Sequence, residues 1–305
     1  MMDIEKKIVI VIGNGFDLDI GWNTTYKAFM ESMDFWPFHK EAHGLGAWLN
    51  IQAHYDNWYD LEKMLRTYAC LIQDRSLLFD VETDKSHFAI LKYRIGDYLQ
   101  TESTRAIRRT SMACSLLHWL AKNRNVKIYS FNYTNLQNIL DSLKIEENIP
   151  CEYIHGSLAS QTQILGIDDH AEVREGYHFL LKTFQPSYRS HNMLDDMRDA
   201  YCVIFYGLCM GEIDYPYFKL FFQERCSEEL YKEKRNKKYI CFFTKDENSV
   251  IDIKRNLLSM NDGKLMQMFC YNKMAFFTTE GKIWSQEYLE LDHYFYNLNL
   301  NLSMV

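Results

Sequence analysis

Proline and glycine are scarce in this chain, and no stretch rich in either of them divides it. Its 305 residues include only 4 Pro and 13 Gly. Flexible linkers between domains are usually rich in Gly, Ser or Pro, so the sequence gives no position at which to separate domains. We therefore expect a single α/β domain over residues 1–305, large enough to bury a sizeable core and carrying an insertion.

Long hydrophobic runs, a signal peptide and paired cysteines are missing as well. No run approaches the roughly 18 apolar residues that cross a bilayer, and the acidic start MMDIEKK does not fit a secretory signal. The 8 cysteines form no C-x-x-C pair, and most lie in apolar runs where a free thiol behaves as a small hydrophobe. These absences predict a cytoplasmic protein in a reducing compartment, with no membrane partner.

Positive charge is in deficit, with a net charge of −7. Affinity for the nucleic-acid backbone rests on Lys and Arg, so the balance argues against a protein that mainly coats nucleic acid. A metal site is not expected either. His39 and His43 are spaced by one helical turn in HKEAH, but no third ligand is evident from the sequence.

What the sequence does contain is a series of short apolar runs rich in Val, Ile, Phe and Tyr. Their continuous hydrophobicity predicts strands buried on both faces, as in a parallel sheet. Helical patterns between the runs give the alternation of a Rossmann-like α/β fold, with a mostly parallel sheet flanked by helices. The predicted strands span residues 7–13, 126–131, 151–156, 163–167, 201–207, 238–244 and 265–271.

The stretch 31–123 breaks this alternation. It contains no convincing strand, but apolar residues recur at helical spacing in 57–72, 86–100 and 105–122. We expect an α-helical insertion after the first strand, which either walls a ligand cleft or serves as scaffolding.

The first predicted strand runs into the turn GNGFD, from Gly13 to Asp17. Two glycines at such a turn let the backbone approach a pyrophosphate, whose charge the amides of a following helix complement. However, the dinucleotide-binding fingerprint requires a third glycine where this chain has Leu18. The turn therefore indicates either a phosphate site or a buried strand that meets a loop, and it disfavours an ordinary dehydrogenase.

Three later strands also end in polar residues, where ligands of open α/β sheets bind. Asn132 in SFNYTN can donate and accept hydrogen bonds without bringing a charge, or it can form an Asx turn beside the N-cap Thr134. His155 in YIHGS suits a general base, although a lone histidine can also be structural. Asp214 in FYGLCMGEID could either cap the next helix or bind a ribose hydroxyl.

Taken in order, these four strand ends are similar to the motifs of sirtuin-type NAD-binding domains. The phrases GNGFDL, SFNYT, IHGS, ILGIDD and YG…GEIDYPYF, with NWYDLEKML in the helical stretch, more closely resemble the AbiH family of bacterial abortive phage infection proteins. The resemblance spans roughly residues 7–225. This chain departs from the family in two places: GWNTT replaces a Gly-Leu-Pro-Thr-like stretch, and Leu208 and Cys209 replace a common His-Ser pair.

The resemblance implies a sirtuin-like core and an antiphage effector that hydrolyses NAD to nicotinamide and ADP-ribose, without a metal. It implies that Asn132 orients the nicotinamide ribose or the attacking water, and that His155 accepts a proton. The residues expected to bind NAD are Gly13, Asn14, Gly15, Phe16, Asp17, Tyr133, Thr134, Gly207, Cys209, Gly211 and Asp214.

Two other functions stay open. One is a non-catalytic sensor that binds NAD or an ADP-ribose derivative and reports through the helical insertion. The other is an effector directed at nucleic acid, which the acidic charge balance disfavours. Because an abortive-infection NADase must be silent until a phage triggers it, a homo-oligomer or a partner defence protein is a candidate for its control.

Overall fold

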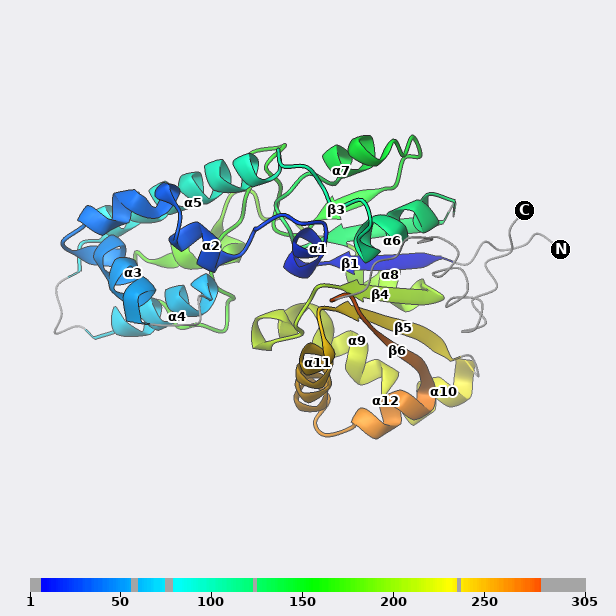
Figure 1. Cartoon of the computed structure of the whole chain (residues 1–305). Helices are drawn as coiled ribbons and strands as arrows, with labels where there is room; N and C mark the ends of the chain where they lie inside the picture. The colour runs from blue at the N-terminus through cyan, green and yellow to red at the C-terminus, as the bar shows by residue number, and fades with distance from the viewer. Residues whose placement is uncertain (1–6, 56–59, 75–78, 123–124, 235–236, 281–305) are drawn as a thin grey trace.

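The computed structural model describes residues 7–55, 60–74, 79–122, 125–234 and 237–280. At its centre is a six-stranded sheet whose strands all run parallel, in the order β3-β2-β1-β4-β5-β6 (Figure 1). This order is typical of a Rossmann-like fold and confirms the predicted parallel sheet. The strands are β1 (Ile8–Ile12), β2 (Val126–Ser130), β3 (Cys151–Tyr153), β4 (Cys202–Tyr206), β5 (Lys238–Thr244) and β6 (Asn272–Thr278).

Helices connect the strands, and most of the chain between β1 and β2 is helical. This part holds α1 (Asn14–Asp19), α2 (Tyr26–Met30), the 3-10 helix η1 (Met33–Lys40), α3 (Gly44–Tyr55), α4 (Leu61–Leu71), α5 (Val81–Glu102) and α6 (Met112–Ala121). The later helices are α7 (Leu136–Leu143), η2 (His178–Leu180), η3 (Lys182–Phe184), α8 (Met193–Asp199), η4 (Glu212–Asp214), α9 (Tyr215–Arg225), α10 (Glu228–Lys234), α11 (Glu247–Met260) and α12 (Leu265–Tyr271).

The sheet is covered on both faces, and β1 illustrates why its sequence is apolar throughout. Side chains of a strand alternate between the two faces. Ile8, Ile10 and Ile12 belong to one core with α1, α6 and α7, whereas Val9 and Val11 belong to the opposite core with α8, α9, α11 and α12. Because neither face meets solvent, the strand has no position for a polar residue.

The helices between β1 and β2 divide between two places. Helix α6 packs on the sheet, in the core that contains Ile8. Helices α2, η1, α3, α4 and α5 instead build a third core with residues 165–181, and we call this assembly the helical lobe. The lobe lies beyond the carboxyl ends of the strands, as Figure 1 shows.

Two of the predicted strands are wrong. The run 265–271 is helix α12, and β6 begins directly after it at Asn272. Leu, Met and Gln favour helices, and a short apolar run does not reveal its period. The described run 163–167 forms no strand of the sheet. Its Ile167 packs in the core of the helical lobe and makes an isolated bridge to Leu181.

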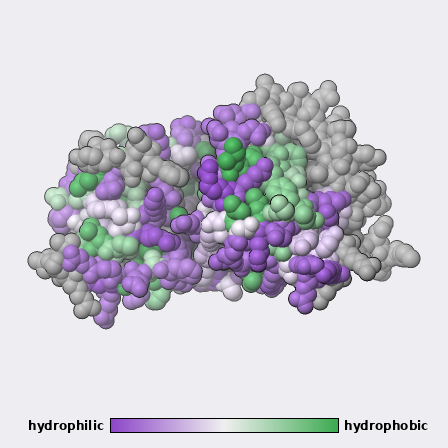
Figure 2. Space-filling model, turned by 90° about the horizontal axis from the view of Figure 1, so that it is seen from below, coloured by the Kyte–Doolittle hydropathy of each residue, from purple (hydrophilic) through white to green (hydrophobic). Residues whose placement is uncertain are grey.

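Helices α9, α11 and α12 form the lower surface in Figure 1 and expose hydrophobic side chains there. Figure 2 looks at this surface and has green, hydrophobic atoms gathered over the half of the molecule that contains the sheet. These exposed residues are Leu220, Ile251, Leu258, Met266 and Phe269. Among the residues that the structure describes, no helix is long and apolar enough to span a membrane.

The turns that follow β1 and β4 touch each other backbone to backbone. The Gly15 amide donates to the Gly207 carbonyl over 3.0 Å. A Cβ atom on Gly15 would lie 2.5 Å from Gly207 Cα, and a Cβ atom on Gly207 would lie 2.4 Å from the amide nitrogen of Phe16. Gly207 also has a φ of +67°, which side chains rarely adopt. Only glycine fits both positions.

Gly207→Ala is expected to lower the free energy of unfolding by about 3 kcal/mol or more, since it adds a steric clash to the cost of a left-handed backbone. Gly263→Ala is the matched control, because Gly263 has a φ of +82° but no heavy atom within 4 Å of its Cβ position. It should cost only about 1 kcal/mol. Urea unfolding measures both values. Equal losses of stability in the two variants would contradict a close backbone contact at Gly207.

Candidate functional site

A cavity of about 110 Å³ lies where β1 and β2 end, against the helical lobe. It is smaller than the roughly 300–1,000 Å³ of pockets that hold drug-sized ligands. It therefore suits a fragment, such as a ribose with part of its base, rather than a whole dinucleotide. Five of the predicted site residues line it: Asn14, Asp17, Asn132, Tyr133 and Thr134.

The helical lobe forms the opposite wall of this cavity, which we call the Asn132 cavity. Tyr26 and Phe29 come from α2, and Tyr98 comes from α5. The Tyr98 hydroxyl donates to the Asn23 carbonyl over 2.6 Å, and this bond fixes the ring at the wall. The lobe thus supplies mostly aromatic surface, whereas the sheet side supplies the polar groups.

The Asp17 carboxylate is the centre of the polar side. It is buried, and it accepts hydrogen bonds from Asn132 Nδ2 over 3.0 Å and from Thr134 Oγ1 over 2.8 Å. Asn132 Nδ2 also donates to the Gly13 carbonyl over 3.0 Å. Since a carbonyl can only accept, this bond fixes the orientation of the carboxamide. Asn132 Oδ1 has no hydrogen-bond partner among the described residues, and it is the atom left for a ligand.

Burial raises the pKa of Asp17 from 3.8 to about 7, even though the hydrogen bonds from Thr134 and Asn132 oppose the shift. A carboxyl group that is taken out of water without a cation disfavours its charged form. Near neutral pH, Asp17 therefore exchanges a proton at the floor of the cavity. The network can bind a polyhydroxyl group such as a ribose through Asn132 Oδ1, and its charge changes in the physiological range.

The glycine turn does not present three free amides to a phosphate. The Gly13 amide donates to the Tyr206 carbonyl, the Gly15 amide to Gly207, and the Phe16 amide to Gly13. The Phe16 ring packs in the sheet core, edge-on to Tyr206. Of the turn residues before Asp17, only Asn14 faces the cavity, with its Oδ1 accepting from Thr24 Oγ1 over 2.5 Å.

His155 lies apart from the Asn132 cavity and does not line it. Its Nε2 is 3.1 Å from the Tyr217 hydroxyl, and its ring packs edge-on against Phe131. Burial lowers the pKa of His155 well below 6.5, and the nearby side chains of Lys182 and His191 act in the same direction. The imidazole is therefore neutral at physiological pH and able to accept a proton, but Tyr217 holds it.

The fourth predicted motif also lies outside the lining of the Asn132 cavity. Gly207 contacts the β1 turn, and Asp214 closes its own turn by accepting from the Gly211 amide over 3.2 Å. The Cys209 thiol lies 3.8 Å from the same carboxylate oxygen. Burial, followed by the charge of Glu62, raises the pKa of Asp214 to about 6.

Two buried charged residues near these groups were not predicted. Lys182 on η3 bonds Glu62 on α4 over 2.8 Å, and both side chains are almost fully buried. The pair links two segments of the helical lobe. Its charges affect the pKa values of both His155 and Asp214. The two residues are 120 positions apart in the chain, so no local sequence pattern could have predicted the pair.

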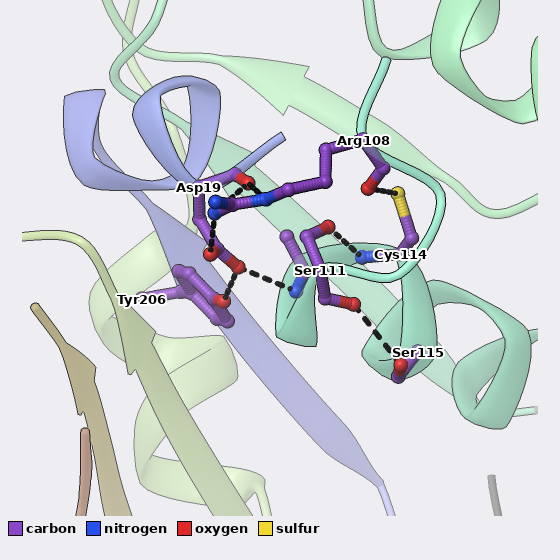
Figure 3. A network of polar contacts seen from close by, with 7 residues as sticks. Asp19, Arg108, Ser111, Cys114, Ser115 and Tyr206 are labelled. Carbon is purple, nitrogen blue, oxygen red and sulfur yellow. Dashed lines mark hydrogen bonds and ion pairs between the residues drawn. The ribbon is translucent and has the colours of Figure 1, made fainter. Parts of the chain in front are cut away.

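Asp19 was also missed, and it holds α1 to the sheet and to α6 (Figure 3). Its carboxylate accepts from the Ala113 amide over 2.9 Å and from the Tyr206 hydroxyl over 2.5 Å, and it pairs with Arg108 at 2.8 Å. The amide belongs to the first turn of α6, whose N-terminal dipole favours a negative charge. This network has a structural role, since it lies in the core beneath the β1 turn.

The described residues contain no group of three or more His, Cys, Asp or Glu side chains that could hold a metal ion. Of the HKEAH pair, the side chain of His39 falls outside the described residues.

Comparison with protein families gives one match. The family model for bacteriophage abortive infection AbiH matches residues 9–231. The matched range runs from β1 into α10 and includes the Asn132 cavity, His155 and the Glu62–Lys182 pair. No curated protein matches the chain.

Asp17→Asn is expected to change how stability depends on pH. The raised pKa means that folded Asp17 binds its proton more tightly than unfolded Asp17. Its contribution to the free energy of unfolding is therefore greatest below about pH 4, and it falls by about 4 kcal/mol as the pH rises to about 7. Asparagine does not titrate, so the variant should gain stability relative to the wild type between pH 4 and 8.

Urea unfolding at pH 4, 6 and 8 measures this difference. Asp141→Asn, at an exposed position on α7, is the matched control and should follow the wild type at every pH. A wild-type curve that stays parallel to that of Asp17→Asn would contradict a buried, titrating Asp17.

Proposed function

Because the chain belongs to the AbiH family of bacteriophage abortive infection proteins, we propose that it acts as an antiphage effector by hydrolysing NAD to nicotinamide and ADP-ribose. In this proposal the Asn132 cavity holds the nicotinamide ribose, and the rest of the dinucleotide extends beyond it. NAD is the substrate, and the residues of the cavity bind and orient it.

The observation that carries the proposal is the fixed position of Asn132. Two donated hydrogen bonds, to Gly13 and Asp17, direct its Oδ1 away from the network that holds it. The cavity adjoins the carboxyl ends of parallel strands, where ligands bind in open α/β folds. An oriented carboxamide oxygen suits a ribose hydroxyl, or a water that must approach the sugar from one side.

The chemistry requires few groups. The bond between ribose C1′ and the nicotinamide nitrogen breaks, both electrons leave with nicotinamide, and the ring departs neutral. The sugar then carries positive charge, as in glycoside hydrolysis. Water attacks C1′ and loses one proton to a base. We assign this base to His155, whose lowered pKa keeps it neutral, and its ring has to leave Tyr217 to reach the sugar.

Because the His155 ring would have to leave Tyr217 to act as the base, a second candidate function is a non-catalytic sensor of NAD or an ADP-ribose derivative. In this alternative, His155 stays bound to the Tyr217 hydroxyl and only the cavity engages the ligand. The helical lobe, which forms one wall of the cavity, would then report occupancy.

A turnover experiment separates the two functions. The purified chain is incubated with NAD, and nicotinamide and ADP-ribose are quantified by chromatography. Calorimetry measures NAD binding in parallel. For a hydrolase, His155→Ala should lower the rate by about 100-fold or more while NAD still binds, because general bases contribute at that scale.

His118→Ala on α6 is the matched control and should retain the wild-type rate. Binding of intact NAD without any product, even with protein in excess, would identify a sensor. The absence of both binding and turnover would overturn the assignment to NAD.

A further inference from the structure

A second, larger cavity of about 330 Å³ lies beside the carboxyl end of β3. It shares no lining residue with the Asn132 cavity. Its walls come from the end of β3 and the first loop after it, residues 152–162, and from a second loop, residues 187–191. Its lining carries several hydroxyl groups, one guanidinium, one imidazole and the carboxylate of Glu152. The proposed function assigns no part of NAD to this cavity.

Three hydroxyl groups of the first loop form a chain of hydrogen bonds along the cavity. Ser157 Oγ and Ser160 Oγ are 2.8 Å apart, and Ser160 Oγ and Thr162 Oγ1 are 2.6 Å apart. Gly156 sets the shape of this loop. It has a φ of +72°, and a Cβ atom there would lie only 2.0 Å from the Thr162 carbonyl oxygen. The hydroxyls are therefore presented by a loop whose conformation depends on glycine.

Arg189 in the second loop has donors to spare. Its Nη1 donates to the carbonyls of Pro186 over 2.6 Å and Tyr188 over 2.8 Å. Its Nε and Nη2 have no partner within the described part of the chain. Arg198 differs, since its Nε, Nη1 and Nη2 all donate to the carboxylates of Asp195 and Glu224. The bonds to the backbone thus anchor the Arg189 guanidinium and leave one edge for an acceptor.

His191 adds an unsatisfied atom. Its Nδ1 is buried and has no hydrogen-bond partner in the described ranges. Burying a polar atom without a partner costs free energy, and the His191 residue that carries this atom lines the cavity. The His191 ring also lies 6.0 Å from the Tyr217 ring, whose hydroxyl is hydrogen-bonded to His155. The cavity therefore adjoins the proposed base.

We propose that this cavity binds the phosphate group of a small phosphorylated molecule, either a sugar phosphate or a nucleotide. A guanidinium edge gives two parallel donors that match an oxyanion, and the hydroxyl groups of the first loop complete its coordination. The carboxylate of Glu152 at the wall is offset by Lys127, at 3.0 Å. The volume exceeds that of a bare phosphate and falls within the range for small-molecule sites.

Calorimetry with ribose 5-phosphate, AMP, inorganic phosphate and unphosphorylated ribose tests this proposal directly. The wild type should bind ribose 5-phosphate or AMP at least about tenfold more tightly than ribose. Arg189→Gln, which removes the charge at a surface position, should weaken binding of the phosphorylated compounds about tenfold or more. Ser160→Ala provides a second, milder variant and should weaken it severalfold. A preference for AMP identifies a nucleotide, and equal affinities identify a sugar phosphate.

Arg255→Gln on α11 is the charge-matched control, since Arg255 is exposed and pairs only with Asp252 in the structure as described. It should bind like the wild type, and thermal unfolding checks that all variants are folded. Equal binding by the wild type and Arg189→Gln would overturn the proposal, and so would a failure of the wild type to distinguish ribose 5-phosphate from ribose. Neither result depends on whether NAD is hydrolysed.

Discussion

The backbone contact between the turns after β1 and β4 is the constraint on which the site depends. In a sheet of this strand order, the crevice between these two strands is where a ligand would normally lie. Here the Gly15 amide donates to the Gly207 carbonyl, and the two glycines leave no room between the turns. The Asn132 cavity lies instead over the ends of β1 and β2. The glycines of the β1 turn thus allow two loops to pack closely against each other. Leu18 in place of the third fingerprint glycine agrees with a ligand site outside this crevice.

The same contact fixes α1, and α1 places two aspartates with different tasks. Asp19 faces the core, where Arg108, Tyr206 and the start of α6 surround its carboxylate. Asp17 faces the other way and orients Asn132 and Thr134 at the cavity. Asp19 has a cation and a helix N-terminus nearby, whereas Asp17 has only neutral donors. Because Asp17 is buried without a cation beside it, burial raises its pKa to about 7.

The parallel sheet could be predicted from the sequence, because strands such as β1 and β5 are buried on both faces and their apolar runs are unbroken. It also pointed to Asp17 and Asn132 as residues that follow neighbouring strands, and the fold brings their side chains into contact at one edge of the sheet. It failed at α12, where a short apolar run has no readable period. It could not reveal Asp19 or the Glu62–Lys182 pair, since their partners lie far away in the chain and only the fold brings them together.

We propose that Asn132, held by Asp17, contacts a ribose in the cavity between the sheet and the helical lobe. A crystal structure of the chain with ADP-ribose tests it most directly. We expect density for a ribose in the Asn132 cavity, with Asn132 Oδ1 within hydrogen-bond distance of a hydroxyl or a bound water. Density for ADP-ribose elsewhere, with the cavity holding no part of it, would contradict the role of Asn132 in binding the ribose.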